Sequence, residues 1–423
     1  MSATTQTQNA DPQIRLKVAW RDPIAATAMT LLTVLLITIT SGASHLTWAG
    51  ATSWFEIPET VLPGRPTVII MAVIAAALTA WIWKLALSHK HISGWLLLGV
   101  GIAFVLAFLV STVAGRESSH LPMVSLLTGA LAFATPLVFG SLSGVVCERS
   151  GVINIAIEGQ LLFGAFMGAV VASLAGNAYF GLIGASIAGV MVAALLALFT
   201  VNFRTDHIIV GVVLNMLVLG LTSFLYSTVL KFRAESLNSV NALAPIPIPI
   251  LKDIPVIGPL LFNQSLLVYL MFIAVIALQF MVFNSRWGLR MRACGEHPKA
   301  ADTVGIKVNL TRWRNVLLGG ALAGLGGAFF SIGQGLAFSK DMAAGNGFIA
   351  LAAMILGRWN PKGAFAAALL FGFATKLGQI MQATGSSIPS EFLLMTPYII
   401  TILAVAGFVG AVRAPAAEGK PYP

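Results

Sequence analysis

The chain consists mainly of continuous apolar runs of about 20 residues, separated by short polar or charged segments. A helix of that length crosses the hydrocarbon core of a bilayer, roughly 30 Å thick, because each residue rises about 1.5 Å. The pattern predicts spans at Ile24–Thr40, Pro66–Trp83, Trp95–Val113, Pro122–Val146, Gln160–Ala175, Phe180–Thr200, His207–Leu230, Ser265–Phe283, Asn315–Phe338, Gly363–Ile380 and Leu393–Val412. A further run, Phe348–Leu356, is too short to span alone. We predict an all-α polytopic integral membrane protein with about 10–12 transmembrane helices, some of them broken or re-entrant.

The composition supports this fold class. Hydrophobic residues make up 57% of the 423 positions and charged residues only 9%. Soluble domains carry about 25% charged residues, so the composition argues against a soluble protein. The apolar runs are continuous and do not alternate with polar positions, which argues against a transmembrane β-barrel.

The positions of the basic residues predict the orientation of the spans. The net charge is +10, and the Lys and Arg residues lie mostly between apolar runs. With the N-terminus inside, the external side receives only Arg65, Arg116, Lys231, Arg233, Lys252 and Lys340, while Lys376 falls within a span. Because basic residues gather in cytoplasmic loops, we expect both termini to be cytoplasmic in a multi-pass protein of the cell membrane. Topology thus explains the charge, and no nucleic-acid partner is expected.

Polar residues interrupt the apolar pattern in the segment Ser143–Ala169. The interrupting residues include Glu148, Arg149, Gly151, Asn154, Glu158 and Gly159. Such residues are costly at membrane depth unless they face protein or water. A break between two half-helices beside a substrate path is one interpretation. The alternative is an ordinary cytoplasmic loop in which Glu148 and Arg149 form a solvated pair.

Further polar residues occur in the second half of the chain. The predicted substrate pathway combines them with the first group: Asn154, Glu158, Asn215, Gln334, Asn346 and Gln379. Amide and carboxylate side chains suit a ligand rich in hydroxyl groups or carrying a base. The alternative for each residue is a hydrogen bond between helices.

The segment Asn284–Asn315 is the most charged part of the chain. Pro298 can start a short helix, which Gly305 would end. A short helix held outside the membrane can dock on a soluble partner. The alternative is a basic loop that lies on the lipid surface.

Enzyme motifs are not found in the sequence. The patterns GxxxxGK[ST], GxSxG and HExxH do not occur. The chain is therefore expected to be no enzyme and to bind no cofactor itself. Cys147 and Cys294 have no second cysteine at metal-ligand spacing, so neither a disulfide nor a metal site is expected.

Several motifs resemble those of one transporter superfamily. They are ERSGVINIAIEGQLLFGAF, GLRMRACGEHPKAADTVGI, RNVLLGGALAGLGGA and GRWNPKGAF, in this order along the chain. Together they resemble the permease subunits of the branched-chain amino acid and simple-sugar ABC importers. The segment GVINIAIEG, where sugar permeases carry a GIDLSVG-like version, is similar to the nucleoside-import, guanosine-type branch.

The resemblance implies partners and roles. Family members pair with an ABC ATPase, which binds ATP and magnesium, with a second paralogous permease in a heterodimer, and with an extracellular substrate-binding lipoprotein. The residues expected to dock on the ATPase are Gly295, Pro298, Ala300, Ala301, Asp302, Gly305 and Ile306. The expected role is import of a nucleoside or a related sugar-containing molecule, with simple sugars or branched-chain amino acids as the alternative.

The resemblance also divides the chain into regions. Residues 1–23 form a cytoplasmic N-terminal tail, residues 24–121 a peripheral transmembrane extension, residues 122–412 the permease core, and residues 413–423 a cytoplasmic C-terminal tail. Two rival functions remain open. One is an ion-coupled secondary transporter that uses Glu148, Glu158 and Lys376, and the other is a structural or assembly protein of the membrane without cargo.

Overall fold

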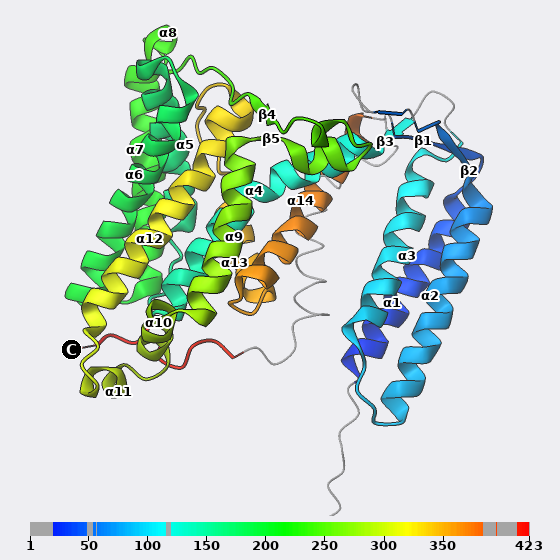
Figure 1. Cartoon of the computed structure of the whole chain (residues 1–423), viewed down its shortest axis with the longest axis horizontal. Coiled ribbons are helices and arrows are strands. Elements are labelled where there is room, and N and C mark those ends of the chain that lie inside the picture. The colour runs from blue at the N-terminus through cyan, green and yellow to red at the C-terminus, as the bar shows by residue number, and fades with distance from the viewer. Residues whose placement is uncertain are drawn as a thin grey trace, which may run out of the picture. The chain divides into compact units, whose positions relative to one another are not determined.

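The computed structural model describes residues 20–48, 54–55, 57–115, 120–383, 395 and 413–422. Within these residues, ten helices are long and apolar enough to cross a membrane (Figure 1). The predicted all-α polytopic fold is confirmed. The last predicted span, Leu393–Val412, lies outside the described residues apart from Met395.

The chain divides into two compact units, the first formed by residues 1–45 and 61–120. Its helices are α1 (Arg21–Ile39), α2 (Gly64–Leu87) and α3 (Gly94–Val113). Apolar side chains of all three helices form its core, for example Leu36, Val68 and Ala107. The short strands β1 (Ala43–Thr47), β2 (Thr60–Pro63) and β3 (His120–Pro122) pair in the order β2-β1-β3.

The second unit, residues 46–60 and 121–423, holds the remaining helices. Its long helices are α4 (Met123–Arg149), α5 (Ile157–Ala175), α6 (Ala178–Ala197), α7 (His207–Leu225), α9 (Leu266–Asn284), α12 (Val308–Ala328) and α14 (Pro361–Ala383). The π-helical turns η1 (Leu198–Asn202), η2 (Tyr226–Leu230) and η5 (Phe329–Gly335) extend α6, α7 and α12. These bounds differ from the predicted spans by only a few residues, except that α12 begins seven residues earlier, at Val308.

The short elements of this unit connect the long helices. They are α8 (Ala234–Leu237), α10 (Arg286–Glu296), α11 (Pro298–Thr303), α13 (Asn346–Leu356), the turns η3 (Leu251–Asp253) and η4 (Gly258–Phe262), and the strands β4 (Pro245–Pro247) and β5 (Asn263–Ser265). Strands β4 and β5 pair antiparallel. At 11 residues, α13 is about 16 Å long, so it cannot span alone, as the sequence predicts.

Small residues let the central helices of this unit pack closely. Every residue of α4 from Ala134 to Glu148 is buried. A Cβ added at Gly164 of α5 would clash with the backbone of Gly324 in α12. Glycines at such positions let helix backbones touch, as is typical of membrane helices. Figure 1 shows α12 running beside α5 and α6, which it contacts along much of its length.

Candidate functional site

The segment between α4 and α5 turns back along α4. Residues 152–154 have no regular structure, and α5 begins at Ile157. Positions next to Gly140 and Gly144 of α4 are occupied by the Ile157 side chain. These glycines lie about 8–14 Å along α4 from Arg149, the last residue of α4. α5 therefore starts beside α4 and not beyond its end. The interruption predicted from the sequence is therefore a non-helical segment, residues 150–156, which we name the re-entrant segment because it turns back along α4. The helix that follows it, α5, is long enough to cross a membrane and is not a half-helix.

Asn154 is fully buried in this segment. Its Nδ2 donates to Ser143 Oγ at 3.1 Å and to Gln160 Oε1 at 3.0 Å, and Gln160 Nε2 donates back to Asn154 Oδ1 at 3.3 Å. In this conformation the Asn154 amide holds the re-entrant segment against α4 and α5. Sequence reasoning missed Gln160, although it follows Glu158 by two residues within the same polar motif.

Glu158 joins the start of α5 to the start of α13. Its Oε1 accepts a hydrogen bond from Gly345 N at 2.8 Å, and its Oε2 accepts one from Gly347 N at 2.6 Å. The first backbone N–H groups of a helix have no partner within the helix, so a carboxylate satisfies them and also suits the positive end of the helix dipole. Asn346, at the same turn, donates from Nδ2 to Ala343 O at 2.7 Å. The structure thus brings together two predicted residues, Glu158 and Asn346.

The backbone at this contact requires glycine. Gly345 has φ +83°, in the left-handed region. A Cβ at Gly347 would lie 2.5 Å from Glu158 Cα. We name Glu158, Gly345, Asn346 and Gly347 the α5–α13 junction. No sequence signal pairs its two halves, because they lie far apart along the chain.

Asn215 of α7 holds the same region from the other side. Its Oδ1 accepts from Gly159 N at 2.8 Å, and its Nδ2 donates to Ile155 O at 2.9 Å. A Cβ at Gly159 would lie 3.1 Å from Asn215 Oδ1, which explains the glycine at that position. Asn215 therefore fixes the re-entrant segment to α7.

The other two predicted pathway residues lie elsewhere. Gln334 is exposed in η5, and Gln379 is exposed on α14. Neither takes part in the hydrogen bonds of the α5–α13 junction.

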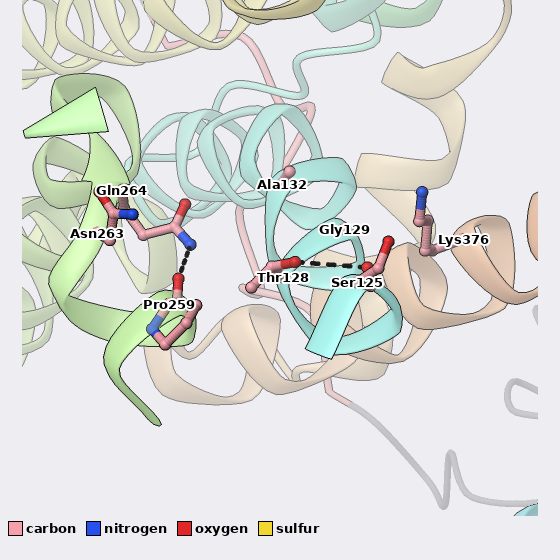
Figure 2. Close-up of a pocket in the computed structure, with 8 residues that line it drawn as sticks. All are labelled: Ser125, Thr128, Gly129, Ala132, Pro259, Asn263, Gln264 and Lys376. Carbon is pink, nitrogen blue, oxygen red and sulfur yellow. Dashed lines mark hydrogen bonds between the residues drawn. The ribbon is translucent and has the colours of Figure 1, made fainter. Parts of the chain in front are cut away.

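A polar cavity of about 420 Å³ opens at the other end of α4 (Figure 2). Its lining residues come from α4, η4, β5 and α14: Ser125, Thr128, Gly129, Ala132, Pro259, Asn263, Gln264 and Lys376. The aliphatic carbons of Lys376 fill the space beside Gly129, where a Cβ would lie 2.5 Å from Lys376 Cε. Hydroxyl, amide and ammonium groups can hydrogen-bond a polar ligand. Sequence reasoning missed this cavity because its members are ordinary polar residues from four separate elements.

Glu148 and Arg149, at the end of α4, both bind Trp359. Trp359 Nε1 donates to Glu148 Oε2 at 2.6 Å, and Arg149 Nε donates to Trp359 O at 3.0 Å. Glu148 is only 3% exposed. The solvated pair considered above is therefore excluded, and these residues tie α4 to the end of α13.

The predicted docking segment forms two short helices. α11 starts at Pro298 and ends before Gly305, which has φ +82°, so both predicted boundaries are confirmed. Ala301 is buried against Cys294 and Val308, with Ile306 at the edge of this cluster. Ala300 and Asp302 are exposed. α11 is thus anchored by one face and offers the other to solvent.

Gly295 connects this segment to the end of α4. A Cβ at Gly295 would clash with Arg149 O. The end of α10 therefore rests directly on the turn that follows α4.

Comparisons with known proteins agree on one family. The profile described as branched-chain amino acid transport system / permease component matches residues 126–409. The nucleoside ABC transporter permease protein NupC of Lactococcus lactis is 42% identical over 69% of this chain and 94% of its own length. The guanosine ABC transporter permease protein NupQ of Bacillus subtilis is 40% identical over the same shares.

A second permease of the same Lactococcus lactis strain also matches. The nucleoside ABC transporter permease protein NupB is 27% identical over 75% of this chain and 90% of its own length. No solved structure was found to match the chain. Helices α1–α3 precede the residues that the family profile matches.

Proposed function

Because the chain belongs to the branched-chain amino acid transport system / permease component family, we propose that it is the membrane-spanning subunit of an ATP-driven importer of nucleosides. The observation that carries this proposal is the match to two nucleoside-type permeases at 40% identity or more, which covers 94% of each relative. The motif GVINIAIEG supports the same substrate class. Simple sugars and branched-chain amino acids are the substrates that a competition experiment must separate from nucleosides.

The proposed import path runs past the polar groups of the second unit. Gln334 and Gln379 are exposed side chains of this unit, and the cavity beside Lys376 offers hydroxyl, amide and ammonium groups. The hydroxyl groups of a ribose and the edge of a base can pair with such groups. In the proposed cycle the path narrows at the α5–α13 junction and at the neighbouring re-entrant segment, which Asn154 and Asn215 hold in place. These bonds must rearrange when the path opens.

The proposed partners follow from the family. A separate ABC ATPase binds ATP and magnesium and docks on α11 from the cytoplasm, where both termini also lie in the proposed topology. The occurrence of NupB and NupC in one organism supports a second, paralogous permease as the other half of the path. A substrate-binding lipoprotein delivers the nucleoside from outside.

A contiguous set of contacts supports the coupling of ATP hydrolysis to the path. α11 follows α10 directly, Gly295 rests on Arg149, and Glu148 and Arg149 both bind Trp359. Trp359 follows α13, whose other end binds Glu158. Energetic coupling requires that both sites bias one element with two arrangements, and α13 is the proposed element.

Transport in proteoliposomes tests the proposal. The complete complex is reconstituted, and uptake of labelled guanosine is followed with loaded binding protein outside and ATP on the side of the ATPase. We expect uptake that requires ATP, stops when the ATPase carries an inactive nucleotide site, and is unaffected by a protonophore. Excess nucleoside should compete, whereas ribose and leucine should not. Uptake that ignores ATP but collapses with the protonophore would instead support the ion-coupled alternative.

A further inference from the structure

The C-terminal residues 413–422 lie against the segment that carries α10 and α11 (Figure 1, red). We name them the C-terminal strap. Composition predicts only a cytoplasmic tail, yet Pro415 and Ala417 of the strap are buried. A terminal segment without regular structure stays in place only when specific contacts hold it.

Backbone hydrogen bonds hold the strap to two elements. Ala417 N donates to Gly295 O at 2.8 Å, at the end of α10. Gly419 N donates to Gly151 O at 3.2 Å, in the turn that follows α4. In addition, Ala416 N donates to Glu296 Oε2 at 3.2 Å. The strap therefore binds both surfaces that meet where Gly295 rests on Arg149.

Arg312, near the start of α12, makes the strap part of a buried polar site. The residue is 1% exposed, and its Nη1 donates to Lys420 O at 2.9 Å. Its Nη2 lies against Gly151, where a Cβ would be only 2.7 Å away. A buried guanidinium is costly unless oxygen atoms surround it. The Lys420 carbonyl supplies such an oxygen, so removal of the strap would leave this charge less well satisfied.

Tyr422 carries the strap to α11. Its ring packs at the edge of the cluster formed by Cys294, Ala301 and Val308. Ala301 belongs to α11, so this packing places Tyr422 in contact with that helix. Within the four residues Gly419–Tyr422, the strap thus contacts both the turn at Gly151 and the cluster at α11.

We infer that the C-terminal strap is a positioning element that links α11 to the turn after α4, and that Tyr422 is its contact with α11. This inference rests on the proposed function, because α11 is the proposed ATPase contact. α11 has six residues, too few for a helix to be stable without tertiary contacts. A push on α11 could be absorbed by rotation of so short a helix. The strap provides a second connection, beside α10, by which that push reaches Gly151 and the re-entrant segment.

The test uses three variants of the full chain in the reconstituted complex. Tyr422→Ala removes the contact with α11, and Tyr422→Phe keeps the ring packing but removes the hydroxyl. Lys420→Ala is the matched control, because among the described residues the Lys420 side chain bonds only Ala416 O, within the strap, and the carbonyl that holds Arg312 remains. The measured quantities are complex yield, thermal midpoint, basal ATP hydrolysis and the number of nucleosides imported per ATP.

For Tyr422→Ala we expect a complex of normal yield and basal hydrolysis whose import per ATP falls about fivefold or more, within the usual range of coupling energies. Tyr422→Phe keeps the ring in this cluster, so its import per ATP should stay close to that of the control. An unchanged ratio in Tyr422→Ala would overturn the inference. So would a lower thermal midpoint with an unchanged ratio, because the strap would then be a structural clamp only. Failure of the wild-type complex to import with ATP would contradict the proposed function instead.

Discussion

The substitution Glu158→Gln addresses the contact between the first turn of α5 and the start of α13. The wild-type carboxylate accepts two hydrogen bonds from backbone N–H groups. One comes from Gly345, just before α13, at 2.8 Å, and the other from Gly347, in the first turn of α13, at 2.6 Å. Glutamine has nearly the same shape, so the change removes charge and one acceptor without leaving a cavity. Its oxygen can keep one of the two bonds, while its NH₂ group turns a donor toward the other N–H.

The expected loss follows from these two bonds. A hydrogen bond to a charged group contributes about 1.5–3 kcal/mol, and a neutral one about 1 kcal/mol. A buried N–H that faces a donor costs about 1–3 kcal/mol. Because Glu158 is half-buried and water can reach part of the site, we expect the first turn of α13 to lose about 2–4 kcal/mol of local stability.

Amide hydrogen exchange measures this loss directly. A loss of that size raises the exchange rate of the peptide that contains Gly345 and Gly347 by roughly 30- to 700-fold, since about 1.4 kcal/mol corresponds to a factor of ten. The matched control is Asp206→Asn. Asp206 also caps a helix, accepting from Ile208 N at 2.8 Å, but it is exposed, so the loss at α7 should stay below about 1 kcal/mol.

An exchange rate at α13 that rises no more than in the control would refute the role assigned to Glu158 in holding α13 to α5. The same variant tests the proposed path in the reconstituted complex, where we expect reduced uptake because α13 is no longer held at its N-terminus. Normal uptake with normal expression would remove Glu158 from the pathway.

Three further predictions concern packing and the strap. Gly164→Ala places a methyl group against the α12 backbone and should cost about 1–3 kcal/mol, seen as a lower thermal midpoint, whereas Gly220→Ala, at an open position, should be neutral or stabilising. Trp359→Phe leaves the buried Glu148 carboxylate without its indole donor and should cost about 1–3 kcal/mol; an unchanged midpoint would contradict that contact. Burial raises the pKa of the Glu418 carboxyl, so the strap is held most firmly at low pH and loosens as the pH rises through that raised pKa. The Glu418 carboxyl also faces the Glu148 carboxyl, so Glu418→Gln should reduce this loosening, which amide exchange of the strap at acidic and alkaline pH measures.

The apolar spans and the ends of α11 could be predicted because they depend on local information. A run of apolar residues fixes where a helix can cross a membrane, whatever its neighbours are. Pro298 and Gly305 act through their own backbone preferences, at the start and end of one short helix. The polar interruption near Glu158 was visible for the same reason, since a charged residue stands out in an apolar stretch.

The bonding partners of the polar residues could not be predicted in this way. The Glu158 carboxylate binds an N–H group 187 positions further along the chain, and Trp359 binds Glu148 across a similar separation. Asn154 and Asn215 were predicted only as polar residues of a pathway, and the structure shows which groups they hold. The strap gave no sequence signal, because most of its contacts use backbone atoms that every residue carries.

By itself, therefore, the amino-acid sequence determined that this protein is a bundle of membrane-spanning helices, with one polar break and one short helix held outside the membrane. It also carried the motifs of a permease family. The tertiary structure alone decided that Glu158 of α5 caps the start of α13, and that the C-terminal strap closes on α11. The physical reason is the separation along the chain over which each effect acts. Apolar length and backbone preference act over neighbouring residues, whereas the hydrogen bonds between α5 and α13 depend on how the whole bundle packs.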